Sequence, residues 1–199
     1  ELRRLREETK EELLPKALLK SERNRACFIH SESLLVIDAG TDSKAEWFID
    51  QLRTCFGEFN CTPLAFNHEP AELLKRIFLG ESPLGFTLGR DCRMQDLSDS
   101  KSFATWREFE LTDPSIRKHV ADGMRLTHLG VGFDELLGCV INEHGDITKF
   151  KFIEGDAADI PDSEDPLARL DADFVLLSGT VTRMVANLKK LLGGYATAG

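Results

Sequence analysis

Apolar residues recur at helical spacing in two long segments, which predicts two amphipathic helices. The first covers residues 43–56, and the glycine that follows it is typical of a helix C-cap. Its apolar face consists of Ala45, Phe48, Ile49, Leu52 and Phe56. The second runs from about residue 174 to Gly193, with an apolar face of Phe174, Leu177, Val181, Met184, Val185, Leu188, Leu191 and Leu192. We expect this late helix to belong to the core rather than to an interface, although residues 174–177 also fit a short strand.

Helix start and stop signals mark three further helices. Glu69-Pro70 opens one that ends at Gly80. Thr112-Asp113-Pro114 opens another, which stops at Gly123. Residues 1–20 indicate a solvated helix, because charged side chains dominate and a few leucines supply the apolar content; it breaks near Pro15.

Apolar runs bounded by turn residues predict the strands. We expect strands at residues 27–29, 34–37, 61–64, 86–88, 103–111, 124–133, 136–141 and 147–153. Residues 142–146 form the hairpin turn between the last two. Hairpins interleaved with helices favour an α+β fold with mixed, largely antiparallel sheets. We divide the chain into a charged helical segment at 1–25, a first α+β lobe at 26–110 and a second lobe, with the hairpin and the C-terminal helix, at 111–199.

The net charge of −9 in 199 residues counts against a uniformly basic nucleic-acid binder. The charge is unevenly distributed, however. Residues 1–25 contain eight Lys and Arg against six Asp and Glu, so the remainder of the chain carries −11. Residues 154–173 hold eight acids against one arginine. A basic surface that is separated from an acidic exterior is therefore compatible with this composition.

Cysteine usage and hydropathy indicate a cytoplasmic protein. The five cysteines are odd in number and show no zinc-site spacing, so we expect buried, reduced thiols. No apolar run approaches the roughly 18 residues that a membrane span needs. The first residue is Glu1 rather than methionine, which leads us to expect a missing upstream segment.

Motifs for catalysis are weak in this chain. Residues 36–41 resemble the first phosphate loop of actin-like ATPases and sugar kinases, but a strand end followed by a helix N-cap explains them equally well. Asp38, Glu46 and Asp50 could supply metal ligands to a nuclease, and a solvated helix face is the alternative explanation. Neither a nucleophile elbow nor a Walker loop occurs. We therefore predict no catalytic residue, no metal ligand and no cofactor.

Several segments, each weak alone, occur in a specific order and spacing from Leu13 to Gly194. They are residues 13–18 (LLPKAL), 35–38 (LVID), 43–46 (SKAE), 52–53 (LR), 83–89 (PLGFTLG), 111–112 (LT) before the helix that ends at Gly123, 124–130, 149–152 (KFKF), 171–174 (DADF) and 191–194 (LLGG). As an ordered set they resemble the RdgC family of bacterial recombination-associated, DNA-binding proteins. The resemblance covers nearly the whole chain but only about the last two thirds of such a protein.

The resemblance implies an α+β protein whose dimer closes a positively lined ring around duplex DNA, with little sequence preference. It also implies restraint of RecA-mediated strand exchange and of recombination at replication forks, within the nucleoid. At two places the chain departs from the family pattern. Leu18 stands where the family commonly has a Phe finger that closes the ring, which implies a smaller plug. Arg107 keeps a basic position, but Glu108 and Phe109 follow it where the family often has Gln, which weakens the expectation of DNA contact there.

We therefore expect a non-enzymatic homodimer that binds double-stranded DNA and antagonises RecA. The candidate DNA contacts are Lys16, Lys20, Arg23, Arg76, Arg90, Arg93 and Arg107. The candidate dimer-interface residues are Leu14, Leu18 and Leu19. Two alternatives stay open, which are a metal-dependent exonuclease and a protein-interaction module without DNA binding.

Overall fold

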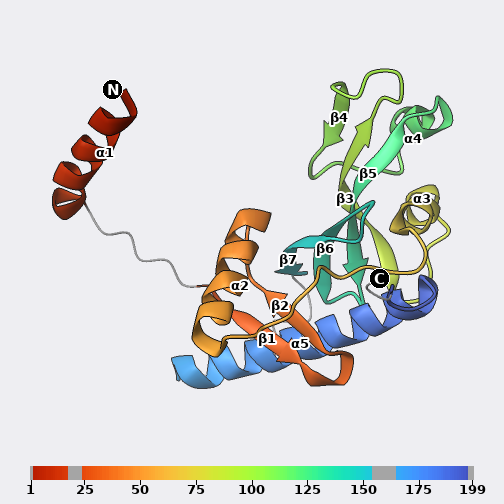
Figure 1. Cartoon of the computed structure of the whole chain (residues 1–199). Helices are drawn as coiled ribbons and strands as arrows, with labels where there is room; N and C mark the ends of the chain where they lie inside the picture. Colours follow the sequence, from red (N-terminus) through yellow and green to blue (C-terminus); the bar gives the residue numbers. More distant parts are fainter. Residues whose placement is uncertain (1, 18–23, 154–164, 197–199) are drawn as a thin grey trace.

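The computed structural model describes residues 2–17, 24–153 and 165–196 (Figure 1). Its α-helices are α1 (Leu2–Leu13), α2 (Asp42–Phe56), α3 (Pro70–Leu79), α4 (Pro114–Ala121) and α5 (Pro166–Leu191). Its strands are β1 (Ala26–Ile29), β2 (Leu34–Ile37), β3 (Phe86–Gln95), β4 (Phe103–Trp106), β5 (Arg125–Phe133), β6 (Leu137–Asn142) and β7 (Ile147–Phe152). Two short 3-10 helices are η1 (Leu14–Lys16) and η2 (His30–Glu32). Helices interleave with antiparallel strands, which confirms the predicted α+β class.

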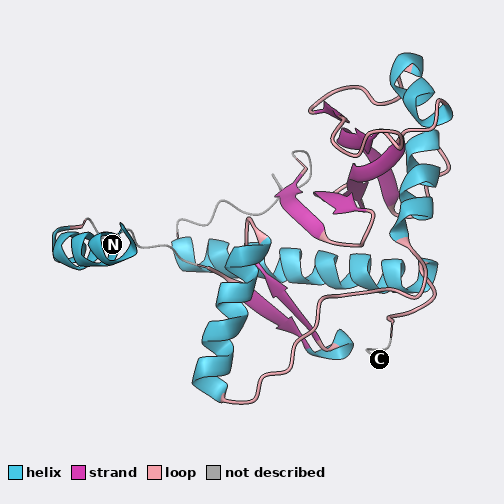
Figure 2. Ribbon diagram, turned by 45° about the horizontal axis from the view of Figure 1, so that its top comes forward, coloured by secondary structure: helices cyan, strands magenta, loops and turns pink. Residues whose placement is uncertain are grey.

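Five strands form one antiparallel sheet in the order β4-β3-β5-β6-β7, and β1 pairs with β2 in a separate hairpin. The larger sheet is strongly curled (Figures 1 and 2). A bulge in β3 accompanies this curl. Leu88 pairs with Val131 and Cys92 pairs with Leu129, so three residues of β3 lie opposite one residue of β5. Gly89 allows the close approach of the two strands there, because a Cβ atom at this position would lie 2.6 Å from the carbonyl carbon of Gly130.

One face of the large sheet is covered by α3 and by the C-terminal half of α5. Met94, Leu129 and Ile141 of the sheet are buried in one cluster with Leu74 of α3 and Met184 of α5. Apolar burial of this extent is the main stabilising term of the fold. The buried face of α5 confirms that the late helix belongs to the core.

A second region consists of β1, β2 and α2, residues 24–56, and we call it the hairpin lobe. Among its residues only Ile29 is buried. The predicted apolar face of α2 is therefore only half covered, and Phe56 remains 72% exposed. A polar contact joins the lobe to the C-terminal end of α5, since Glu32 accepts hydrogen bonds from Lys189 and from the Tyr195 hydroxyl, both at 2.8 Å.

The N-terminal helix α1 lies apart from the other elements in Figure 1. All described side chains of residues 3–17 are exposed. Ion pairs along the helix support it, as between Arg4 Nε and Glu8 Oε1 at 2.8 Å. The α-helix ends at Leu13 and η1 contains Pro15, in agreement with the predicted break.

Three predicted strands differ from the structure. Residues 61–64 form no strand; Leu64 packs against the core, and the nearby Phe66 makes an isolated antiparallel bridge with Tyr195. The strand expected over 103–111 ends at Trp106, since Glu108 adopts a left-handed backbone with φ 51° that turns the chain. The strand expected at 86–88 is longer and continues to Gln95.

The late helix begins earlier than its apolar face suggested. The Asp165 carboxylate accepts a hydrogen bond from the Leu167 N–H and caps the first turn, so α5 extends over 26 residues from Pro166. Residues 174–177 are therefore helical, and the alternative of a short strand is wrong. Among the described helices, α5 included, none combines the length and the hydrophobicity needed to cross a membrane.

The cysteines only partly match the expectation of buried thiols. All five are free. Cys92 and Cys139 are buried, and burial raises the pKa of each thiol to about 12. Cys55 is exposed on α2, which corrects the expectation for that position.

Candidate nucleic-acid interface

The face of the large sheet opposite the core carries polar residues and glycines, and we call it the open face. Leu129 and Val131 of β5 are buried in the core, so the alternation of a strand places His128, Gly130 and Gly132 on the opposite side. The missing side chains of the glycines leave room on this face, which is hollowed in two places.

The first hollow has a volume of about 530 Å³ and spans the sheet from β4 to β7. Its wall includes Arg93, Thr105, Arg107, His128, Thr148 and Lys149. The second hollow, of about 770 Å³, includes Arg90, Glu108, Gly130, Gly138, Lys149 and Lys151 in its wall. Asp91 and Lys149 border both hollows, so the two form one continuous surface.

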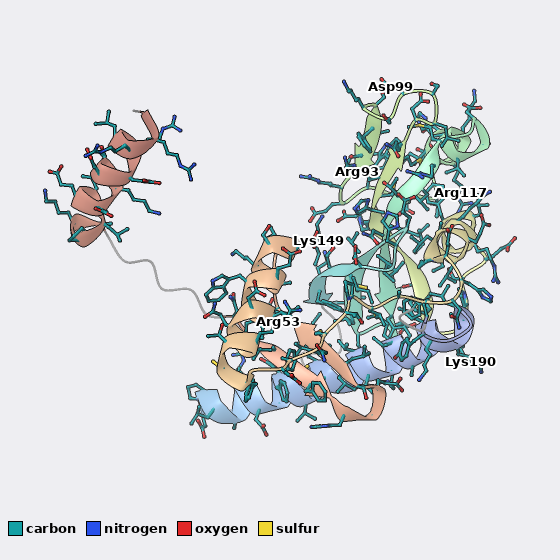
Figure 3. All side chains as sticks on the ribbon, in the orientation of Figure 1. Arg53, Arg93, Asp99, Arg117, Lys149 and Lys190 are labelled. Atoms are coloured by element: carbon teal, nitrogen blue, oxygen red, sulfur yellow. The ribbon has the colours of Figure 1, made fainter. Side chains whose placement is uncertain are left out.

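Cations dominate this surface although the chain as a whole is acidic. The two hollows are lined by the five cations Arg90, Arg93, Arg107, Lys149 and Lys151. Among the described residues of the two walls, the acids Asp91 and Glu108 accompany them. In Figure 3 the labels of Arg93 and Lys149 lie on one side of the sheet, away from Arg117 of α4 and Lys190 of α5. The described walls of the two hollows thus carry an excess of positive charge, which is what a phosphate-binding surface needs.

Arg93 is held in place by an aromatic ring. Its guanidinium carbon lies 4.0 Å from the centroid of the Phe103 ring on the neighbouring strand β4. Antiparallel pairing of Arg93 with Thr105 brings the ring within reach as a diagonal neighbour. Stacking of this kind restricts the side chain while leaving guanidinium N–H groups available to a phosphate.

Arg90 of β3 bonds to the segment that follows β4. Its Nη2 donates to the Glu108 carbonyl at 2.9 Å, and the Phe109 N–H donates to the Arg90 carbonyl at 2.9 Å. The Glu108 N–H in turn donates to Asp91 Oδ1 at 2.9 Å. These bonds stabilise the left-handed turn at Glu108 and hold the adjacent Arg107 at the wall of the first hollow. Arg90 thus has a structural function besides its charge, and Glu108 contributes to that turn.

Lys149 and Lys151 are cations of the open face that our sequence-based candidates lacked. Lys149 adopts a left-handed backbone with φ 54° at a register shift between β6 and β7, and its Nζ lies 3.8 Å from Asp91 Oδ2. Lys151 pairs in register with Gly138 on β6. The alternation Lys-Phe-Lys-Phe over residues 149–152 is the sequence signal that could have identified them, because it places both lysines on one side of a strand.

The structure brings Arg90, Arg93 and Arg107 together, but the other predicted contacts lie elsewhere. Arg76 belongs to α3, on the side of the sheet that carries the core, and its Nε lies 3.6 Å from Glu81 Oε2. Lys16 belongs to η1, and its Nζ lies 3.8 Å from Glu12 Oε1. Lys20 and Arg23 lie outside the described residues. DNA contact by these four stays a prediction.

The predicted dimer contacts fall in the N-terminal segment. Leu14 of η1 is 65% exposed and has the surface that an interface residue needs. Leu18 and Leu19 lie outside the described residues. Their participation in a dimer stays a prediction.

The carboxylates considered for a nuclease are not a metal cluster in this structure. Asp50 pairs with Arg53 of its own helix at 2.9 Å, and Asp38 follows β2 at an exposed position. Among the described residues, no group of three or more His, Cys, Asp and Glu side chains could hold a metal ion.

The fold and the open face together define an α+β protein with a segregated cationic sheet surface. Residues 1–195 match the family model described as "Putative exonuclease, RdgC", and the chain belongs to the RdgC family, as its resemblance predicted. It is 30% identical to the recombination-associated protein RdgC of Dechloromonas aromatica over 199 residues, covering 98% of this chain and 66% of that protein. The RdgC protein of Stenotrophomonas maltophilia is 30% identical over 193 residues, covering 96% of this chain and 64% of that protein. The chain thus spans about two thirds of the length of these relatives.

Proposed function

We propose that this protein binds duplex DNA without sequence preference, through the open face of its five-stranded sheet. The observation that carries the proposal is the group of five cations against two acids among the described residues of that face, in a chain of net charge −9. Cations arranged in this way replace the counterions condensed on the phosphate backbone, which supplies affinity for any sequence.

Several properties of the open face favour phosphate contacts over recognition of bases. Lys and Arg are its principal donors, and the hydroxyls of Thr105 and Thr148 lie beside them in the first hollow. Glycines form much of the second hollow. Contacts to phosphate position a protein on DNA but carry no sequence information, so binding through this surface is expected to be unspecific.

The proposal extends to a homodimer that closes a ring around DNA and modulates RecA-dependent recombination in the nucleoid. The recombination-associated names of the relatives support the biological setting. The exposure of Leu14 supports its proposed part in the dimer contact. Ring closure would retain the protein on DNA even where each phosphate contact is weak. On a closed circular duplex we expect retention through a high-salt wash, and loss of retention when the circle is cut.

Salt titration tests the DNA-binding proposal. We expect the logarithm of the association constant for a labelled duplex to fall linearly with the logarithm of salt concentration, with a slope of about −0.9 per phosphate neutralised. Replacing Arg93 and Arg107 together by alanine should reduce the magnitude of that slope by about two and weaken binding about 10- to 100-fold at moderate salt. Lys190→Ala is the matched control, because Lys190 is an exposed cation on α5, outside both hollows. A flat salt response would favour a protein-interaction module, and equal losses in both variants would remove the open face from the proposal.

The proposal describes a binding protein rather than an enzyme, and the exonuclease alternative has a direct test. Purified protein is incubated with end-labelled linear duplex in Mg²⁺ or Mn²⁺, and we expect the label to remain in full-length strands. Degradation that disappears in the Asp38→Asn variant would contradict the binding-only proposal and assign a catalytic metal ligand to the end of β2.

A further inference from the structure

The hydrogen bonds around His128 favour a proton on one of its two ring nitrogens. The Thr127 hydroxyl has a single proton and donates it to the Arg93 carbonyl at 3.0 Å. With that proton used, the contact of 3.1 Å between Thr127 Oγ1 and His128 Nδ1 is a hydrogen bond when Nδ1 is the donor. In the neutral ring Nε2 is then the nitrogen without a proton, and it is the atom that becomes a new donor when the ring is protonated.

His128 lines the first hollow together with the phosphate-binding cations proposed above. Arg93 faces it from β3 and Lys149 from β7, while Glu143 and Asp146 face it from the turn between β6 and β7. Burial, followed by the charge of Arg93, lowers the pKa of the imidazole, and the two carboxylates oppose this shift. Without an anion in the hollow, the ring is therefore neutral at neutral pH.

An anion in the hollow would reverse this balance. A phosphate between Arg93, Arg107 and Lys149 offsets the cations that disfavour the imidazolium, and it offers an oxygen to a protonated Nε2. The proton would come from solvent, and no other group need change its charge. Linkage then requires that a ligand which raises the pKa of His128 binds more tightly as the pH falls.

We propose that His128 is a phosphate contact of the first hollow that acts only when protonated, so that phosphate binding there is coupled to the uptake of one proton. The ligand class is a phosphate oxyanion, supplied either by a DNA phosphodiester or by free phosphate. The inference rests on the DNA-binding function proposed above and adds to it a residue and a pH dependence.

The pH dependence of duplex binding tests this inference. Fluorescence anisotropy with a labelled duplex is recorded at constant ionic strength from about pH 8 to about pH 5.5, a range that brackets the ordinary histidine pKa. We expect the dissociation constant of the unchanged protein to fall about tenfold, the usual scale for one charge-assisted hydrogen bond. His128→Gln should abolish most of this change. His128→Lys should bind tightly throughout the range, because its charge is permanent.

His144→Gln is the matched control, because His144 is exposed on the turn between β6 and β7 and lies outside the first hollow. It should keep the full pH dependence of the unchanged protein. Equal tightening of His128→Gln and the unchanged protein at low pH would overturn the inference and leave the DNA-binding proposal intact. Circular dichroism of each variant verifies that it is folded.

A second measurement separates failure of the inference from failure of the proposed function. The pKa of His128 is followed by NMR of its ring Cε1–H signal, with and without inorganic phosphate. We expect phosphate to raise the pKa of His128. If the unchanged protein binds no duplex at any pH but phosphate still raises the pKa of His128, the hollow is a site for free phosphate and the DNA proposal fails. An unchanged pKa of His128 in phosphate would overturn the inference.

Discussion

The two regions that share helix α5 differ in how they are stabilised. Where α5 packs against the five-stranded sheet, the apolar face of the helix is buried, and Met184 and Leu188 are at most 1% exposed. Toward the N-terminal end of α5 the same face is exposed to solvent, and Leu167 and Phe174 are 73% and 50% exposed. The difference shows that an amphipathic pattern indicates which side of a helix is able to be buried, while its neighbours determine whether it is.

The hairpin lobe shows the same contrast in its own helix. Its helix α2 has no buried residue, and Trp47 and Phe56 are exposed. The ion pair of Glu32 with Lys189 and its hydrogen bond with Tyr195 are polar contacts that hold the lobe to the body. The lobe therefore joins the body through these polar contacts and through a small apolar contact of Ile29, Leu34 and Val36, whereas the sheet region has extensive apolar burial.

Leucine-to-alanine substitutions on the apolar face of α5 should give the largest difference in stability between the two regions. Leu188→Ala removes a fully buried side chain, and we expect a loss of about 3 kcal/mol in the free energy of unfolding. Leu167→Ala, on the same helix, should change it by less than about 0.5 kcal/mol. Urea unfolding followed by circular dichroism measures both. Similar losses would mean that the N-terminal half of α5 is covered in solution.

Glycine-to-alanine substitutions should give the next largest difference in stability between the two regions. In Gly89→Ala the new Cβ would meet the backbone of Gly130, so we expect a loss of about 1 to 3 kcal/mol. Gly40→Ala in the hairpin lobe meets nothing within 4 Å and should be nearly neutral. Thermal unfolding midpoints compare the two variants. A neutral Gly89→Ala would show that the curl of the sheet does not need the close approach of β3 and β5.

The polar attachment of the hairpin lobe should have the smallest effect, and it should depend on pH. Hydrogen bonds from Lys189 and Tyr195 lower the pKa of Glu32, so its stabilising contribution is complete above the ordinary glutamate pKa and is lost as the pH falls through the lower folded value. Glu32→Gln should unfold more easily at neutral pH and should lose less stability on acidification than the unchanged protein. Denaturant midpoints at a series of pH values measure this difference. Parallel pH profiles of the two proteins would contradict the attachment.

Local signals predicted the helices well. Asp113 caps α4 through a hydrogen bond from the Ser115 N–H, and Gly80 ends α3 in a left-handed conformation. Such signals act over a few residues and are therefore visible in sequence. The end of β4 was mispredicted because the turn at Glu108 depends on Arg90 and Asp91, which lie 17 or more residues away along the chain.

The candidate site shows the same division. Arg90, Arg93 and Arg107 were predicted from sequence as DNA contacts and lie on one surface, but nothing local indicates that Arg90 bonds a backbone carbonyl while Arg93 stacks on Phe103. Lys149 reaches the same surface through a register shift between β6 and β7. Arg76 was grouped with them although α3 carries it on the other side of the sheet. Spacing along the chain reports neighbours within one element, whereas a binding surface is assembled across several.

The sequence by itself determined the α+β class, the helix boundaries set by caps, the family and the uneven distribution of charge. Each of these depends on local interactions or on composition. Only the tertiary structure decided the order of the strands, the side of the sheet that stays open and the burial of one half of α5. These depend on contacts between residues distant in the chain, and the strand order β4-β3-β5-β6-β7 brings Arg93, His128 and Lys149 to one hollow.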